Sequence, residues 1–312
     1  MKTKLKGVIL AAGLGSRLAP LTQKTPKPLL PFGPFKLIDY AYKKLLKAGI
    51  EEIAINTHHL SDQLIKWARP KGIQVFHEKQ ILGTLGAFLP MKNWRKNSDL
   101  VVLNSDIYHP TPLKDLLSVY DLQGPDILMS TRSPKIETAT TLWVSKGKLQ
   151  KIGGDAIGEQ HSFACMQVIS HKMLELIPKG FQELKNIYNQ WLATGHDIQV
   201  LPTTGPWADL GTPHEYYQSH FLLEPSTANF QFFPLGTSLK QKGLSIEGPC
   251  YISFDVLNQN QFGSVGPGSV IYSGCHLEGA SVRESLLLPQ TVCSKHEAIE
   301  SQIRSQDFSI PL

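Results

Sequence analysis

The chain contains little cysteine. There are four in 312 residues, at Cys165, Cys250, Cys275 and Cys293, and no two of them form a Cys-x-x-Cys pair. This wide spacing matches neither a zinc site nor the disulfide framework of a small secreted domain. We therefore expect free thiols and a cytoplasmic location.

Long apolar runs and basic clusters are also missing. No apolar segment approaches the roughly 20 residues of a membrane-spanning helix. Lys2, Lys4 and Lys6 precede an apolar stretch, but Gly13 and Gly15 make that stretch too short for the core of a secretory leader. The formal net charge is +5, without a compact Lys/Arg run. We therefore expect a soluble protein that binds small anions rather than nucleic acid or a membrane.

The first half alternates short apolar segments with amphipathic ones. This alternation predicts right-handed βαβ units and a mostly parallel, doubly wound sheet. Ligands should then bind beyond the carboxyl ends of the strands, where Gly13, Asn56, Glu78 and Asp106 fall. The predicted strands are 7–12, 53–56, 73–76, 100–104 and 127–130, and the predicted helices are 37–48, 62–68, 84–91 and 113–120.

The second half begins with a predicted hairpin over 140–152. A strand at 163–169, helices at 171–177 and 181–193, a strand at 198–201 and a last helix at 213–223 follow. The segment 224–227 is typical of a linker. The length allows a large domain plus a smaller one, so we predict domains over 1–225 and 226–312.

The tail has a period of six residues. Val265, Ile271 and Leu277 recur at this spacing. The small residues Ser269, Cys275 and Ser281 do the same. This is the hexapeptide pattern of a left-handed parallel β-helix. The pattern fades after Leu287, which predicts a stack of about two to four coils whose ends are covered by its own domain or by another subunit.

A glycine turn follows the first predicted strand, in the run 10–18 (LAAGLGSRL). Glycines allow close backbone approach, so successive N–H groups can surround a phosphate. Arg17 and Lys27 can neutralise its charge, which favours a triphosphate ligand. The alternative is a dinucleotide fingerprint, but that pattern needs a third small residue where Leu18 stands. A plain glycine turn with two solvated cations is the simplest structural alternative.

Two aspartates end distant segments. Asp106 follows the buried strand pattern 100–104, and Asp209 lies in the turn 207–212 just before a predicted helix. Alone, each is explained as a helix cap or an Asx turn. Together they form the sparse oxygen site that Mg²⁺ accepts, since this ion keeps waters and takes other ligands from phosphate.

Several of these motifs resemble those of the sugar-nucleotide pyrophosphorylases. The segments that resemble the family's motifs are 10–18, 27–31 (KPLLP), 77–87 (HEKQILGTLGA), 104–106 (NSD) and 207–212 (WADLGT). The resemblance implies a Rossmann-like, mixed nucleotidyltransferase sheet followed by the short left-handed β-helix. Segment 55–60 (INTHHL) is similar to members acting on mannose 1-phosphate or N-acetylmuramate 1-phosphate.

The resemblance also implies roles for individual residues. Arg17 would hold the triphosphate and Lys27 the phosphate oxygens near the scissile bond. Asp106 and Asp209 would bind Mg²⁺. The nucleotide would contact Leu10, Ala11, Ala12, Gly13, Gly15, Glu78, Gly83, Thr84 and Asn104.

The sugar pocket departs from the family pattern. Many members carry a Glu-Lys-Pro segment whose lysine binds the sugar phosphate, whereas this chain has Lys151 in a different context. Cys165 stands where a glycine commonly opens the pocket. We predict Cys165, Lys151 and Trp207 as sugar-binding residues. Cys165 is better explained as a small strand residue than as a nucleophile, because no partner histidine is apparent.

The motifs together predict a Mg²⁺-dependent enzyme that joins a nucleoside triphosphate to a sugar 1-phosphate and releases pyrophosphate. Both reactants are anions, so cations must offset their repulsion. A non-catalytic relative, which binds the nucleotide sugar and docks a catalytic partner, is the alternative. A nicotinamide-dependent oxidoreductase is disfavoured by Leu18. The base, the sugar and the oligomeric state stay open.

Overall fold

The computed structural model describes residues 4–133, 136–137, 139–223, 226–227 and 230–312. The chain divides into two compact units. Unit 1 comprises Met1–Gly15, Thr22–Leu29 and Leu37–Trp207, and unit 2 comprises Ser16–Leu21, Leu30–Lys36 and Ala208–Leu312. The predicted boundary after residue 225 lies outside the described residues, and it stays a prediction.

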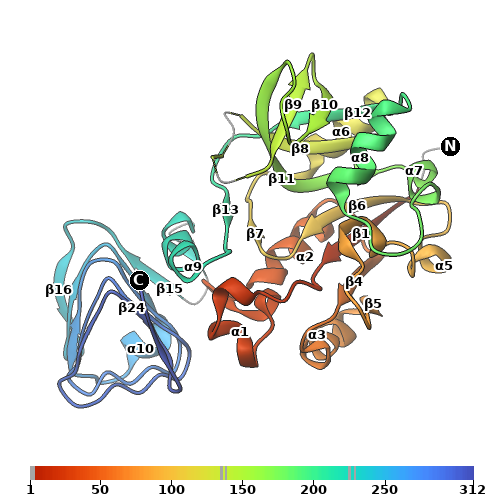
Figure 1. Ribbon diagram of the computed structural model, residues 1–312. Helices are drawn as coiled ribbons and strands as arrows, with labels where there is room; N and C mark the ends of the chain where they lie inside the picture. The colour runs from red at the N-terminus through yellow and green to blue at the C-terminus, as the bar shows by residue number, and fades with distance from the viewer. Residues whose placement is uncertain (1–3, 134–135, 138, 224–225, 228–229) are drawn as a thin grey trace. The chain divides into compact units, whose positions relative to one another are not determined.

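Unit 1 is built on a mixed sheet, to which the described residues contribute nine strands (Figure 1). The strands of this sheet are β1 (Leu5–Leu10), β4 (Ile53–Thr57), β5 (Gln74–His77), β6 (Asp99–Asn104), β8 (Ile127–Arg132), β9 (Thr141–Ser145), β10 (Lys148–Ile152), β11 (Glu159–Ile169) and β12 (Ile198–Pro202). The short strand β7 (Ile107–Tyr108) belongs to the unit but not to this sheet. The order in the sheet is β5-β4-β1-β6-β11-β8-β12-β10-β9. Strands β5, β4, β1 and β6 run parallel, and β11 runs antiparallel to both β6 and β8. The predicted mixed α/β fold is therefore confirmed.

Helices accompany these strands along the chain. They are α1 (Leu21–Lys24), α2 (Leu37–Lys47), α3 (Ser61–Ala68), α4 (Gly83–Gly86), α5 (Lys92–Arg95), α6 (Leu113–Gln123), α7 (His171–Glu175) and α8 (Leu184–Ala193), with 3-10 turns η1 (Ser16–Leu18), η2 (Lys27–Leu29) and η3 (Arg69–Lys71). Among the described residues, no helix is long and apolar enough to cross a membrane.

The sheet of unit 1 has a hydrophobic core on each face. Val8 packs in one core with Phe88 and Met91. Its neighbour Ile9 packs in the other with Ile38 and Leu45 of α2. Successive side chains of a strand point to opposite faces, so burial on both sides explains why the β1 segment is apolar throughout. The sheet thus presents its strand ends, rather than its faces, to ligands.

One predicted helix is much shorter than expected. The prediction covered 84–91, but α4 ends at Gly86 and α5 begins at Lys92. Pro90 disfavours helical conformation at the residue before it, which separates the two short helices. The apolar residues in this stretch are buried nonetheless, since Leu85, Phe88 and Met91 all belong to one core. The apolar residues therefore have the spacing of a buried helix face, although the backbone between α4 and α5 is not helical.

Unit 2 contains a stack of parallel coils. Its elements are β2 (Pro31–Phe32), β3 (Phe35–Lys36), β13 (Ala208–Asp209), α9 (Pro213–Ser219), η4 (His220–Leu222), β14 (Ser226–Thr227), β15 (Phe230–Phe233), β16 (Ser238–Gln241), β17 (Leu244–Glu247), β18 (Cys250–Ser253), α10 (Phe254–Asn258), β19 (Gly263–Val265), β20 (Ser269–Ile271), β21 (Ser281–Arg283), β22 (Leu286–Leu287), β23 (Ala298–Glu300), β24 (Gln302–Arg304) and β25 (Ser309–Pro311). Strands β17, β19, β21 and β23 pair in parallel along one side, and β18, β20, β22 and β24 along a second. A parallel bridge between His276 and Val292 lies on a third part of the coil, and Figure 1 shows the triangular outline.

The six-residue period explains the interior of this stack, with one shift. Val265, Ile271 and Leu277 are buried in its core, as predicted. Ser281 is exposed and Ala280 is buried in its place, and Val282 lies in the interior where the period predicts residue 283. Residue 264 pairs with 281, so that coil takes about 17 residues rather than the 18 of three hexads. The interior position therefore comes one residue early.

Candidate functional site

A cavity of about 260 Å³ opens where β1, β4, β5 and β6 end. We call it the strand-end cavity. Five segments separated in the sequence contribute to it, and a cavity at the strand ends is the placement expected for a ligand site in an open α/β sheet. Its lining residues are Leu10, Ala12, Gly13, Lys27, Pro28, Asn56, Glu78, Ile81, Gly83, Thr84, Asn104, Ser105 and Asp106. Most of the residues predicted to contact the nucleotide are brought together here.

The glycine turn presents its backbone to this cavity. A side chain built on Gly13 would meet no atom within 4 Å, so the backbone there is open. Gly15 has a φ of +65°, and a Cβ on it would lie 2.9 Å from Cγ2 of Thr22. The Thr22 hydroxyl donates a hydrogen bond to the Gly15 carbonyl at 2.9 Å. Glycine is therefore required at position 15 for the turn, whereas the backbone at Gly13 faces open space.

A buried hydrogen-bond network holds the strand ends in place. The Ala11 N–H donates to Oδ1 of Asn56 at 2.7 Å, and Nδ2 of Asn56 donates to Oε1 of Glu78 at 2.7 Å. The other oxygen of Glu78 accepts from the Leu82 N–H at 2.9 Å. Asn56 and Glu78 are 5% and 3% exposed. Both Glu78 oxygens are thus engaged within the protein, and the predicted contact of this side chain with nucleotide stays a prediction.

Lys27 and Asp106 form an ion pair at the cavity. Nζ of Lys27 lies 2.7 Å from Oδ2 of Asp106. The lysine side chain is 9% exposed and the aspartate 31%. A buried ammonium requires a charged partner, and the carboxylate remains accessible at the cavity. The chain therefore places one cation and one anion side by side at the strand-end cavity.

Arg17 and Asp209 are paired more loosely in unit 2. Nη2 of Arg17 lies 4.0 Å from Oδ2 of Asp209, and both side chains are accessible to solvent. A Cβ on Gly211 would lie 2.7 Å from the same guanidinium nitrogen, so this glycine makes room for Arg17. The cap of α9 is Thr212, whose side chain accepts from the Glu215 N–H. Asp209 is therefore not the helix cap that the sequence left open.

Comparison with known proteins shows what the chain is similar to. Residues 6–141 match the family model of nucleotidyl transferases. The chain is 25% identical over 229 residues to the mannose-1-phosphate guanyltransferase beta-B of Xenopus laevis, covering 68% of this chain and 62% of that protein. It is 24% identical over 264 residues to the mannose-1-phosphate guanyltransferase of Saccharomyces cerevisiae, covering 78% and 72%. These similarities support the resemblance to the sugar-nucleotide pyrophosphorylases.

A solved structure of similar fold covers much of the chain. It is a Bacillus anthracis protein, assigned as a glucose-1-phosphate thymidylyltransferase and crystallised with sucrose. The TM-score is 0.62 at 24% identity, over 70% of this chain and 94% of that one. At this identity the similarity concerns the fold. The match to the Xenopus relative spans 62% of that protein's length, so activity and substrates are treated below as proposals.

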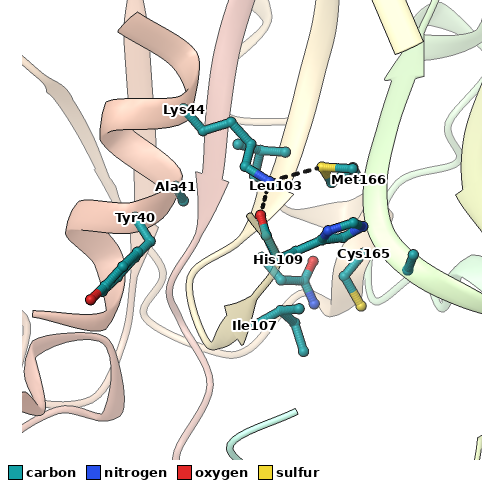
Figure 2. A pocket seen from close by; sticks show the side chains of 10 residues that line it. Tyr40, Ala41, Lys44, Leu103, Ile107, His109, Cys165 and Met166 are labelled. Atoms are coloured by element: carbon teal, nitrogen blue, oxygen red, sulfur yellow. Dashed lines mark hydrogen bonds between the residues drawn. The ribbon is translucent and has the colours of Figure 1, made fainter. Parts of the chain in front are cut away.

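A second, small cavity of about 20 Å³ holds Cys165, the residue that departs from the family's glycine (Figure 2). Cys165 has a φ of +63°, which is the left-handed region that favours glycine. Asn104 lines both this cavity and the strand-end cavity. Cys165 is therefore placed next to the site, as a sugar-binding residue should be, and its contact with sugar stays a prediction.

Lys44 of α2 closes the same small cavity. Its Nζ donates to the carbonyl of His109 (Figure 2). The same atom donates to the carbonyl of Thr111 at 3.0 Å, and both residues lie in the segment after Asp106. Burial lowers the pKa of Lys44 to about 8. Burial, together with the charges of Lys44 and Arg132, lowers the pKa of His109 to about 3. Neutral His109 and the lysine thus fix the segment that follows Asp106.

The other two predicted sugar-binding residues are less distinctive. Nζ of Lys151, on β10, donates to the carbonyl of Asp155 at 3.0 Å, and the side chain is exposed. Nε1 of Trp207 is buried and has no hydrogen-bond partner among the described residues. Neither observation tests a role in sugar binding, and both assignments stay predictions.

Asn56 is the residue whose structural importance the site prediction missed. It was placed at a strand end but was not included among the site residues. The signal was a single amide side chain at the end of the apolar run 53–57. A buried polar group at that point needs partners, and the glycine turn and Glu78 supply them.

The donor set is compatible with the predicted Mg²⁺. Within the described ranges, no group of three or more His, Cys, Asp or Glu side chains is arranged to hold a metal ion. Magnesium is usually bound by one or two carboxylates, with waters and substrate phosphates completing its shell. The accessible carboxylate of Asp106 at the strand-end cavity fits that mode.

Proposed function

We propose that this protein transfers a nucleoside monophosphate from a nucleoside triphosphate to a sugar 1-phosphate. An oxygen of the sugar phosphate forms a bond to the α-phosphorus of the nucleotide. The bond from that phosphorus to the bridging oxygen breaks, and pyrophosphate leaves with the electron pair. The observation that carries the proposal is the strand-end cavity, which combines an open glycine backbone with the Lys27–Asp106 pair.

The residues of the chain would act by positioning and by electrostatics. We assign the triphosphate to the backbone around Gly13 and to the cations Arg17 and Lys27. The remaining nucleotide contacts are those predicted from the sequence, namely Leu10, Ala11, Ala12, Gly15, Glu78, Gly83, Thr84 and Asn104. Cys165, Lys151 and Trp207 are assigned to the sugar.

Asp106 and Asp209 are the residues that would hold Mg²⁺. When bound, the ion would offset the repulsion between the two anionic reactants and the growing charge on pyrophosphate. Asp106 belongs to unit 1 and Asp209 to unit 2. Their joint action on one ion is part of the proposal.

The proposal also covers the second domain, self-association and the location of the enzyme. We propose that the coil stack is a left-handed β-helix, as its six-residue period indicates, and that it forms a separate domain over 226–312. We also propose that its ends serve in self-association and that the enzyme is cytoplasmic.

The test is a pyrophosphate-release assay. Purified protein is incubated with Mg²⁺, each of the five nucleoside triphosphates and a panel of sugar 1-phosphates. Mannose 1-phosphate with GTP is the first pair, because the relatives above are named for it. We expect release from at least one pair, and a rate loss of roughly 10²–10³-fold in Asp106→Asn. The control is Asp115→Asn, an exposed carboxylate in the first turn of α6. Tight nucleotide-sugar binding without pyrophosphate release would contradict the proposal and favour a regulatory subunit.

A further inference from the structure

A phenol on the coil stack contacts a segment that lies far away in the sequence. Tyr272 follows β20, is 3% exposed, and its N–H donates to the Leu287 carbonyl of the next coil at 3.1 Å. Its hydroxyl accepts from the Gly33 N–H at 2.8 Å. Gly33 lies in the turn between β2 and β3. All of these residues belong to unit 2.

The same hydroxyl reaches the end of α9 through a histidine. Nε2 of His220 lies 2.7 Å from Oη of Tyr272, and Nδ1 lies 2.8 Å from the carbonyl of Tyr216. A carbonyl only accepts, so Nδ1 carries the proton. Burial lowers the pKa of His220 to about 4, which keeps the ring neutral at physiological pH. Nε2 is therefore an acceptor, and Tyr272 donates to it.

Aromatic and hydroxyl contacts join α9 to the same turn. The ring of Phe32 packs edge-on against His220, with centroids 4.9 Å apart. The Tyr216 hydroxyl donates to the carbonyl of Pro31. Three successive residues, Pro31, Phe32 and Gly33, are thus held by α9, its terminal histidine and the coil stack.

Helix α9 in turn supports Asp209. It lies close to β13, the short strand that ends at Asp209, only four residues before the helix begins. The helix is capped by Thr212, three residues later. We propose that Tyr272 is a positioning residue for the reaction. Its hydroxyl fixes α9 and the Leu30–Lys36 segment on the coil stack, and thereby sets the position of Asp209 for Mg²⁺. This inference rests on the proposed function.

The test compares two phenols of one sheet. Tyr272→Phe removes the hydroxyl that joins the turn, the helix and the stack. The control is Tyr251→Phe on the neighbouring strand β18. Tyr251 is also buried, but its hydroxyl donates at 2.9 Å to the carbonyl of Leu223, which follows η4 and lies outside the Leu30–Lys36 segment. Each variant loses a buried hydrogen bond, so a merely structural role predicts similar effects.

The kinetic readout is the dependence of pyrophosphate release on Mg²⁺. For Tyr272→Phe we expect kcat/KM to fall about tenfold and the Mg²⁺ concentration for half-maximal rate to rise, because small displacements of positioned groups are costly. High Mg²⁺ should restore part of the rate. Tyr251→Phe should keep the wild-type Mg²⁺ dependence. Equal Mg²⁺ curves for the two variants would overturn the inference.

Hydrogen–deuterium exchange gives a second readout that does not need activity. Exchange in residues 30–36 and 213–219 should accelerate in Tyr272→Phe and stay as in wild type in Tyr251→Phe. Unchanged exchange in Tyr272→Phe overturns the inference whatever the kinetics. A wild-type protein that releases no pyrophosphate refutes the proposed function instead. If Tyr272→Phe does not fold, the double variant Tyr272→Phe/His220→Phe replaces it. The double variant also removes Nε2 of His220, which would otherwise be buried without its hydrogen-bond donor. It is compared with Tyr251→Phe in the same two assays.

Discussion

Asn56→Ala should both lower the free energy of unfolding and displace the backbone that faces the strand-end cavity. The substitution leaves the Ala11 N–H without its acceptor and removes one donor from Glu78. Both sites are buried. An orphaned buried donor costs about 1–3 kcal/mol, and a lost hydrogen bond to a charged group costs a similar amount. Because the two effects share one network and are not additive, we expect the free energy of unfolding to fall by about 2–4 kcal/mol.

The functional part of this prediction concerns the glycine turn. With Ala11 no longer held, the backbone that faces the cavity should lose its fixed position. We expect the KM for the nucleoside triphosphate to rise about tenfold in the pyrophosphate-release assay, with a smaller change in the KM for the sugar 1-phosphate. Urea denaturation measures the stability of the same samples.

Asn189→Ala is the matched control. Asn189 also makes two hydrogen bonds, to the N–H and the carbonyl of Ile152, but it joins α8 to β10. Its loss should lower the free energy of unfolding by about 1–3 kcal/mol and leave the nucleotide KM unchanged. If Asn56→Ala keeps a wild-type KM, or if both variants raise it equally, Asn56 does not hold the nucleotide-facing turn.

Three further predictions follow from local chemistry. The unfolded His220 side chain titrates near 6.5, but burial lowers its folded pKa to about 4. The unfolded state therefore binds more protons between these values, and stability should fall as pH drops through this range. Thermal denaturation against pH should show this fall in wild type and a flatter curve in His220→Phe; equal slopes would contradict it. Gly83→Ala should destabilise more than Gly124→Ala in urea. Both glycines have positive φ, but of the two only Gly83 has no room for a Cβ, which would lie 2.5 Å from the Gln182 carbonyl oxygen. Equal urea midpoints for the two variants would refute this reasoning. Removal of Mg²⁺ with EDTA should abolish pyrophosphate release without changing the circular dichroism spectrum, and added Mg²⁺ should restore the rate; full activity in EDTA would exclude the metal assignment.

Much of unit 1 could be predicted because its signals are local. The segment 5–10 is buried on both faces, and α2 buries Leu37, Ile38, Ala41 and Leu45 at helical spacing. The placement of Gly13, Asn56, Glu78 and Asp106 at strand ends follows from the alternation of strands and helices, and all four line one cavity. Here sequence order and spatial arrangement agree.

Other features depend on tertiary contacts and could not be predicted. The apolar residues of 84–91 are buried like those of a helix, but Pro90 and the turns around it interrupt the backbone. Ser281 is exposed because one coil is a residue shorter than three hexads. The hydroxyl of Tyr272 contacts Gly33 and His220, which lie 239 and 52 residues away in the sequence, and no periodicity signals such contacts.

Label transfer tests the central claim most directly. The protein is incubated with Mg²⁺, a sugar 1-phosphate and a nucleoside triphosphate labelled with ³²P at either the α or the γ position. The account predicts that the α label appears in a nucleoside diphosphate sugar and the γ label in pyrophosphate, and that Asp106→Asn abolishes both. A γ label on the sugar, or an α label only in free nucleotide, would contradict it.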